Sequence, residues 1–179
     1  MPEPVEAPTD TPTGYTPEPG EFFVVRTAGW AGRLIRLGTD SDVNHAGIYL
    51  GKGMTLEAQP GGAIYGHITP PQIDAALWSG MNPTWRLSRI EGEAVCQHTK
   101  THHGDPYSWL DIACIACTIL TRSHVPSVVS ARLDDPHRNI CSQLVDRVYE
   151  EAGVHLFTDG RPHGAVSPGD LRDLITGRV

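Results

Sequence analysis

The segment from Asn139 to Gly153 is the part of the sequence that most constrains how this chain can fold. Its apolar residues recur at the spacing of one helical face, and they are Ile140, Leu144, Val145, Val148, Tyr149 and Ala152. Asn139 is a candidate N-cap, which places Cys141 in the first turn of the predicted helix. Unpaired N–H groups and the helix dipole favour a thiolate there, so Cys141 is a candidate nucleophile. The alternative interpretation is a small buried residue at a helix start.

The composition fits one soluble globular domain. The chain has 179 residues, of which 39% are hydrophobic, and a formal net charge of -7, which disfavours binding to nucleic acid through its phosphates. No apolar run approaches the roughly 20 residues that a transmembrane helix needs. The amino terminus lacks a basic region followed by an apolar one, so we expect no secretory signal. The expected location is the cytoplasm, or outside the cell after delivery by a phage or a secretion apparatus.

The four cysteines do not form the pattern of a disulfide framework. Cys114 and Cys117 are spaced as a C-x-x-C pair, but they lie in an apolar run that predicts a buried helix. No second pair completes a zinc site, so both are interpreted as small core residues. We expect reduced thiols and no metal.

The order of predicted elements indicates an α+β fold, with one sheet packed against helices. Residues 1–20 are rich in Pro, Thr and Glu and lack apolar periodicity, which predicts a disordered tail before a domain at 21–179. The patterns predict strands over 21–26, 44–50, 54–59, 63–68 and 84–87. They predict helices over 30–37, 70–77, 91–103, 108–121, 139–153 and 167–175.

A cysteine nucleophile needs a base, and the base needs a group that orients it. His45 is the strongest candidate for the base, because it lies in an otherwise small and apolar predicted strand. Glu57 is on the next strand, within reach of the imidazole if the turn at 51–53 forms a hairpin. Gln59 follows on the same strand face and is the alternative orienter. Taken singly, His45 could bond only to neighbouring backbone and Glu57 could be an exposed acid.

A second group of histidines favours a different interpretation. His98 and His102 share a helix face at i, i+4 spacing, and His103 is adjacent. Such pairs can bind zinc, but Glu and Lys crowd the segment and no third ligand is evident. A solvated helix face is the expected structure there.

Several short motifs together resemble the NlpC-type papain-like cysteine peptidases. The Cys-Ser-Gln-Leu-Val run at 141–145, in a helix that ends at 153–156, is similar to the family's nucleophile helix. The Gly-Asp-Pro-Tyr-Ser-Trp run at 104–109 resembles its Gly-x-Pro-Tyr element. The histidine strand at 44–51 precedes the cysteine, which is similar to the circularly permuted branch that includes YiiX-like hydrolases. In that branch a glutamate follows on the next strand, as Glu57 does here.

The resemblance implies a fold and an activity. The fold would be a circularly permuted papain-like α+β fold, with a small antiparallel sheet or half-barrel packed on helices. Cys141, His45 and Glu57 would be catalytic and Tyr107 would help to bind the oxyanion, with no cofactor. Ile140 replaces the aspartate that often precedes the family's cysteine, which leaves the capping of the helix start open.

The expected reaction is hydrolysis of an amide bond through an acyl-enzyme. The resemblance points to a peptide or acyl-amide substrate, and the stem peptide of bacterial peptidoglycan is the leading one. One alternative is a lipid or thioester acyl hydrolase or acyltransferase, because the permuted branch includes such enzymes. Another is a structural module, for example in a virion, that keeps a vestigial site.

Overall fold

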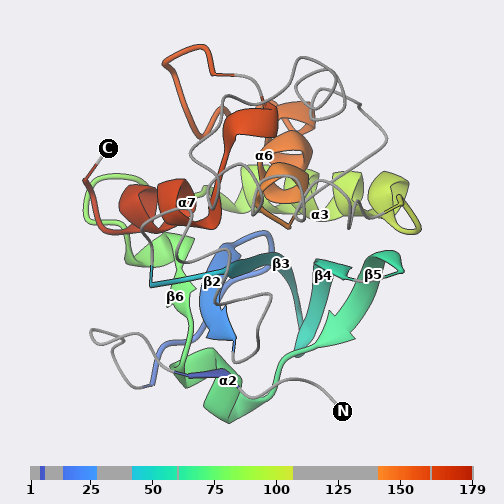
Figure 1. The fold of residues 1–179 in the computed structure, drawn as a ribbon, viewed down its shortest axis with the longest axis vertical. Helices are drawn as coiled ribbons and strands as arrows, with labels where there is room; N and C mark the ends of the chain where they lie inside the picture. The colour runs from blue at the N-terminus through green and yellow to red at the C-terminus, as the bar shows by residue number, and fades with distance from the viewer. Residues whose placement is uncertain are drawn as a thin grey trace, which may run out of the picture.

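The computed structural model describes residues 5–6, 14–27, 42–59, 61–106, 141–161 and 163–178. Within them the chain forms an antiparallel sheet with helices packed on it (Figure 1), which confirms the α+β class. The strands are β1 (Val5–Glu6), β2 (Phe22–Thr27), β3 (His45–Gly51), β4 (Met54–Gln59), β5 (Gly62–His67) and β6 (Leu77–Trp78). Their order is β1-β2-β3-β4-β5, and β6 also pairs with β2.

The β3–β4 hairpin forms where the sequence predicts it. Its turn runs through Gly51, Lys52 and Gly53, which have φ values of 93°, 54° and 78°. Such positive φ angles cost glycine little, which explains Gly51 and Gly53, and Lys52 between them takes the left-handed conformation. The register pairs Gly47 with Glu57 and Ile48 with Leu56.

The helices lie mostly on one side of the sheet. In Figure 1, α3 (Arg89–His102), α6 (Cys141–Glu151) and α7 (Pro168–Ile175) lie above the strands, and α2 (Pro70–Asp74) lies below. Two 3-10 turns, η1 (Ser79–Met81) and η2 (His163–Ala165), complete the described elements. Ser88 and Ser167 form capping boxes with Glu91 and Asp170 and so fix the starts of α3 and α7.

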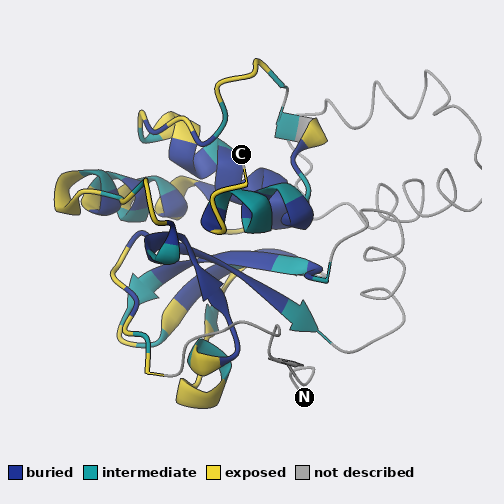
Figure 2. Cartoon of the chain, turned by 90° about the vertical axis from the view of Figure 1, so that its left-hand side faces the viewer, coloured by how far each residue is buried: buried dark blue, intermediate teal, exposed yellow. Residues whose placement is uncertain are grey.

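Alternation along the strands divides the buried residues into two clusters. The larger cluster lies between the sheet and the helices, where Figure 2 colours much of the facing ribbon as buried. Its members include Phe22, Val24, Ala46, Ile48, Leu56, Val95, Leu144, Val145, Tyr149 and Leu171. The smaller cluster uses the opposite sheet face and contains Phe23, Val25, Tyr49, Ile68, Ala76 and Trp78. Since side chains alternate along a strand, Glu57 and Gln59, which alternate with the buried Leu56 and Ala58, belong to this second face.

Two predicted elements differ from the structure. Residues 84–87 form no strand, because the Asn82 side chain accepts hydrogen bonds from the Thr84 and Trp85 backbone N–H groups at 2.7 and 2.8 Å. An Asn side chain that captures the backbone in this way favours a turn over a strand. The helix expected over 70–77 ends at Asp74, and Leu77 instead pairs with Val24 as part of β6. The predicted helices over 30–37 and 108–121 lie outside the described residues.

Part of the predicted tail lies against the domain. Tyr15 stacks on Trp78, with 6.2 Å between ring centroids, and its hydroxyl donates to both carboxyl oxygens of Glu21 at 3.0 Å. Gly20 is buried, and its carbonyl accepts a hydrogen bond from the Tyr149 hydroxyl at 2.5 Å. Composition did not reveal these contacts, since each depends on a single aromatic or glycine residue within a polar segment.

Candidate functional site

His45 stands at the first residue of β3, and the residue before it fixes this position. Asn44 is buried, its side-chain oxygen accepts from the Thr27 N–H at 2.7 Å, and its amide nitrogen donates to the Thr27 hydroxyl at 2.9 Å. The Asn44 backbone N–H also donates to the Val25 carbonyl at 3.1 Å. These bonds tie the end of β2 to the start of β3 and so hold the backbone of His45.

The His45 ring contacts the carboxylate of Glu57. Nε2 of His45 lies 2.8 Å from Oε2 of Glu57, and the two side chains are 19% and 14% exposed. The register places Gly47 opposite Glu57, so the contact with His45 is diagonal rather than directly across the strands. Gly47 permits this, because a Cβ there would lie 2.8 Å from Glu57 Cγ. The missing side chain leaves Glu57 free to lean toward the histidine.

Gln59 and Thr55 both donate to the same carboxylate. Extending the register by two residues places Gln59 opposite His45, but its Nε2 donates to Glu57 Oε2 at 3.3 Å. Thr55 Oγ1 donates to Glu57 Oε1 at 2.6 Å. The described contacts therefore place Glu57 against the imidazole, and Gln59 and Thr55 against Glu57.

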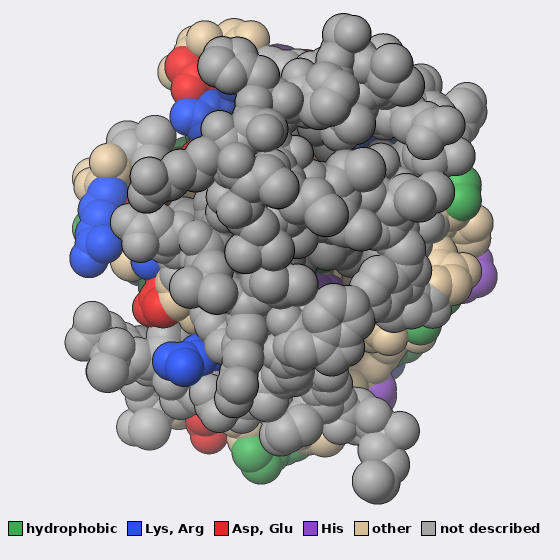
Figure 3. All heavy atoms as spheres, viewed as in Figure 1, with side chains coloured by type: hydrophobic (Ala, Val, Ile, Leu, Met, Phe, Trp, Pro, Cys, Tyr) green, Lys and Arg blue, Asp and Glu red, His purple; other side chains and the backbone are tan. Residues whose placement is uncertain are grey.

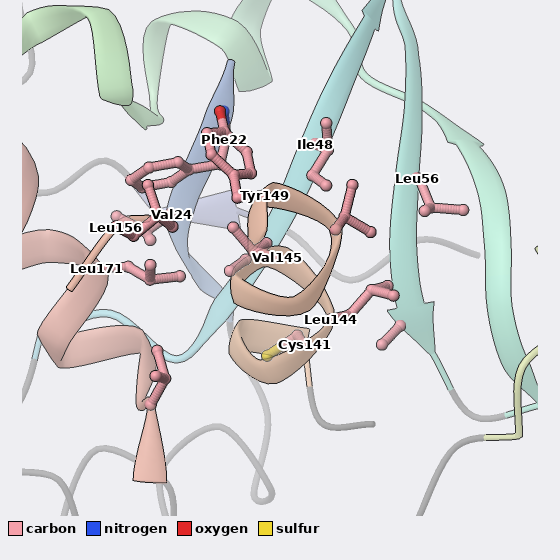
Figure 4. Packing of buried hydrophobic residues seen from close by; sticks show 14 of the residues in the cluster. Phe22, Val24, Ile48, Leu56, Cys141, Leu144, Val145, Tyr149, Leu156 and Leu171 are labelled. Atoms are coloured by element: carbon pink, nitrogen blue, oxygen red, sulfur yellow. The ribbon is translucent and has the colours of Figure 1, made fainter. Parts of the chain in front are cut away.

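Cys141 is the first residue of α6, and its side chain lies at the start of that helix in Figure 4. It is a free cysteine with 5% of its surface exposed. Leu144, Val145 and Tyr149 anchor the helix against the sheet strands, as Figure 4 shows. The buried Ser142 hydroxyl donates to the Val166 carbonyl at 2.7 Å and holds the first turn in place. This anchoring places Cys141 close enough to His45 to raise the pKa of the imidazole.

The His45 ring interacts with both Glu57 and Cys141. Nε2 faces the Glu57 carboxylate, and Cys141 acts on the pKa of the ring. Burial alone would lower the pKa of His45, but hydrogen bonds and charge interactions with Cys141 and Glu57 outweigh it and raise the pKa to about 10. Burial would raise the pKa of Glu57, but the bonds from His45, Thr55 and Gln59 hold it well below its usual range. The geometry thus favours an imidazolium beside a carboxylate.

Several sequence-predicted residues are not placed at the site. Tyr107, Asn139, Ile140, Cys114 and Cys117 lie outside the described residues. Cys96 is on α3 and half-buried, and burial raises the pKa of its thiol. A raised thiol pKa reduces the thiolate fraction, so Cys96 is expected to react slowly.

The His98–His102 pair is bound by carboxylates. His102 Nδ1 lies 2.7 Å from Asp105 Oδ2, and its Nε2 lies 2.9 Å from Glu151 Oε2. His98 Nδ1 lies 3.6 Å from the same Glu151 oxygen. His102 is only 7% exposed, so the predicted solvated face is wrong for this residue. Within 14–27, 42–59, 61–106, 141–161 and 163–178, no group of three His, Cys, Asp or Glu residues could hold a metal ion.

Comparison with known proteins adds no relative: no family model matches the chain, and no curated protein matches it. None of the helices in the described part of the chain is long and apolar enough to cross a membrane.

On the face drawn in Figure 3, acidic and basic side chains lie next to one another at the margin. The ion pairs of Arg161 with Asp159 and Asp170, and of Arg172 with Asp42, are of this mixed kind.

The sequence interpretation did not include Thr55, Gly47 or Gly66 in the site. A signal was available, because Thr55, Glu57 and Gln59 alternate with Met54, Leu56 and Ala58. This period-2 pattern places the three polar residues on one strand face. Gly47 on β3 and Gly66 on β5 then indicate that side chains of β4 occupy the space that a Cβ would fill.

Proposed function

We propose that this protein is a cysteine hydrolase that cleaves an amide bond through an acyl-enzyme. The observation that carries the proposal is the arrangement of two side chains around one imidazole. The His45 ring has Glu57 on Nε2, and its pKa responds to Cys141, which lies at the start of a helix. A nucleophile, a base and an orienting carboxylate in this order are the parts that acyl transfer requires.

In the proposed reaction Cys141 attacks the carbonyl carbon of the substrate as a thiolate. An imidazolium beside the sulfur and the N-terminal end of α6 both favour that thiolate. His45 holds the proton on Nδ1 and gives it to the leaving amine as the C–N bond breaks. Glu57 keeps the ring oriented through Nε2 and stabilises its positive charge. Water, deprotonated by His45, then hydrolyses the thioester and frees Cys141.

The tetrahedral intermediate needs donors for its oxyanion. The backbone N–H at the start of α6 is one candidate, because the first turn of a helix has N–H groups without intrahelical partners. The resemblance to the NlpC-type enzymes assigns the second donor to the Tyr107 hydroxyl. We extend the proposal to this residue on the basis of the resemblance alone.

The proposed substrate class is a peptide amide, with the stem peptide of bacterial peptidoglycan first. This part of the proposal rests on the resemblance of the 104–109, 141–145 and 44–51 motifs to the circularly permuted NlpC-type branch. The proposed fold is the circularly permuted papain-like one, and it is supported by the strand that carries His45 preceding the helix that carries Cys141.

The proposal is tested by incubating the protein with purified peptidoglycan and, separately, with an activated acyl ester. We expect new amine termini from peptidoglycan and an acylated Cys141, and neither from Cys141→Ala. Acylation by the ester without cleavage of peptidoglycan would move the substrate toward lipid or thioester chemistry. No acylation of the wild-type protein by either substrate would overturn the proposed activity.

A further inference from the structure

We propose that Thr55 is a positioning residue for this reaction, and that Gly66 provides the space in which it acts. The inference rests on the proposed pairing of Cys141 with His45. It adds a fourth side chain to the arrangement, since Thr55 acts on Glu57 and thereby on the imidazole. The Thr55 hydroxyl donates to Glu57 Oε1, so its proposed role is to fix the carboxylate.

The two carboxyl oxygens of Glu57 have separate donors. Oε2 faces His45 Nε2 at 2.8 Å and accepts from Gln59 Nε2 at 3.3 Å, whereas Oε1 accepts from Thr55 Oγ1 at 2.6 Å. A carboxylate held through one oxygen can still rotate about its last bond. A donor on the other oxygen removes this freedom, so Thr55 decides where Oε2 points.

Glycines on the neighbouring strands leave room for this contact. A Cβ at Gly66 of β5 would lie 2.8 Å from Thr55 Oγ1 and 2.9 Å from Glu57 Oε1, closer than real Cβ atoms come. A Cβ at Gly47 of β3 would lie 2.8 Å from Glu57 Cγ. Only glycine at both positions lets the carboxylate lie across the sheet with its donor beside it.

Burial makes the Thr55 bond important for the charge of Glu57. Thr55 is fully buried and the Glu57 side chain is 14% exposed, so water is a poor substitute for the hydroxyl. The titratable groups that act on this pair are His45 from β3 and, through it, Cys141 from α6. β5 contributes Ile64 and Gly66, which carry no charge. Without the hydroxyl, the pKa of Glu57 should rise and that of His45 should fall.

The test compares Thr55→Val, which keeps the shape of the side chain, with Thr55→Ser, which keeps the hydroxyl. Thr99→Val is the matched control, because Thr99 is equally buried but its hydroxyl donates to the Cys96 carbonyl. The pKa of the His45 ring is followed by NMR, and the alkylation rate of Cys141 by mass spectrometry. We expect Thr55→Val to lower the pKa of His45 by roughly half to one unit and to slow alkylation roughly 3- to 10-fold.

Thr55→Ser and Thr99→Val should both match the wild-type protein in these two measurements. Gly66→Ala should resemble Thr55→Val, because the added methyl group separates the hydroxyl from the carboxylate. An unchanged His45 pKa in Thr55→Val, with a reactive Cys141 in the wild type, would overturn the positioning role alone. A wild-type Cys141 that is no more reactive than Cys96 would instead overturn the proposed function.

Discussion

Among the described residues, His45 and His102 both contact carboxylates, and they differ in one respect. His102 has a carboxylate on each ring nitrogen, with Asp105 at 2.7 Å and Glu151 at 2.9 Å. The described contacts of His45 include one carboxylate, on Nε2, and its pKa also responds to Cys141. Both side chains are largely buried, at 7% and 19% exposed.

The difference separates a structural histidine from one that can transfer a proton. Only the imidazolium has two N–H groups, so His102 satisfies both carboxylates when it is charged and has no nitrogen left for a substrate. Its bonds tie α3, which carries it, to Glu151 at the end of α6. In the proposed reaction, His45 uses its other nitrogen for exchange of a proton with the nucleophile. The number of carboxylates that contact a histidine ring therefore says more about its role here than the burial of the side chain does.

The largest expected effect comes from replacing each histidine with alanine. His45→Ala should reduce the rate of Cys141 acylation by about 100-fold or more, because it removes the proposed base and acid. His102→Ala should change that rate by less than about 3-fold and lower the free energy of unfolding by about 1 kcal/mol, since Asp105 and Glu151 are partly exposed. Acylation kinetics and urea unfolding measure the two quantities. Equal losses of acylation in both variants would show that His45 and His102 do not differ in this role.

The second effect concerns the group that orients His45. Glu57→Gln should keep the fold and slow acylation about 10- to 100-fold, because the amide cannot stabilise an imidazolium as a carboxylate does. Gln59→Ala should cost less, since Gln59 contacts Glu57 and not the ring nitrogen that Glu57 occupies. Steady-state kinetics of both variants decide between the two orienters. Full activity in Glu57→Gln with loss in Gln59→Ala would reverse the assignment.

The three candidate residues each carry a local signal in the sequence, and the contact expected between His45 and Glu57 is present in the structure. Cys141 begins a periodic helix, His45 is a polar residue in an apolar strand, and Glu57 follows a Gly-Lys-Gly turn. The hairpin register, and hence the diagonal contact over Gly47, was not predictable, since it depends on which strand positions pair.

The partners of Glu21 and His102 were missed for a related reason. Each contact joins residues whose significance appears only after packing, as when Tyr15 folds back on Glu21 or Glu151 meets His102 from 49 positions away. From residue type alone, His102 was predicted to lie on a solvated helix face and Tyr15 in a disordered tail. Helix and strand periodicity carries no information about such pairings.

The third effect is the pH range over which the His45–Glu57 pair contributes to the free energy of unfolding. The pKa of His45 is raised, so its contribution to stability is complete below the ordinary histidine pKa and is lost as pH rises through the raised value. The pKa of Glu57 is lowered, so its contribution is present above the ordinary value and is lost as pH falls through the lowered one. The difference in unfolding free energy between wild type and Glu57→Gln should therefore be largest between these limits. A difference that is flat from pH 3 to 10 would contradict the pairing.

The smallest effect involves a buried carboxyl without a histidine partner. Burial raises the pKa of Glu21 to about 7, so it folds most favourably when protonated. Its contribution is complete below the unfolded-state value of about 4.3 and is lost as pH rises through about 7. Glu21→Gln should remove this slope in Tm, whereas Glu18→Gln should not, because Glu18 is exposed. The acylation rate should stay unchanged in both variants.

Truncation of the amino terminus tests how much residues 14–20 contribute to stability. Removing 1–13 should leave Tm nearly unchanged, whereas removing 1–20 should lower it by several degrees, because Tyr15 and Gly20 contact Trp78, Glu21 and Tyr149. Thermal unfolding monitored by circular dichroism measures both. Identical Tm values for the two truncations would show that residues 14–20 add no stability.

The most direct measurement of the central claim is brief alkylation with iodoacetamide followed by mass spectrometry of each cysteine. We predict that Cys141 is labelled well before Cys96, Cys114 and Cys117 in the wild-type protein. His45→Ala should abolish this preference, and His102→Ala should preserve it. Labelling of Cys141 no faster than Cys96, or an equal loss of the preference in both histidine variants, would contradict the account.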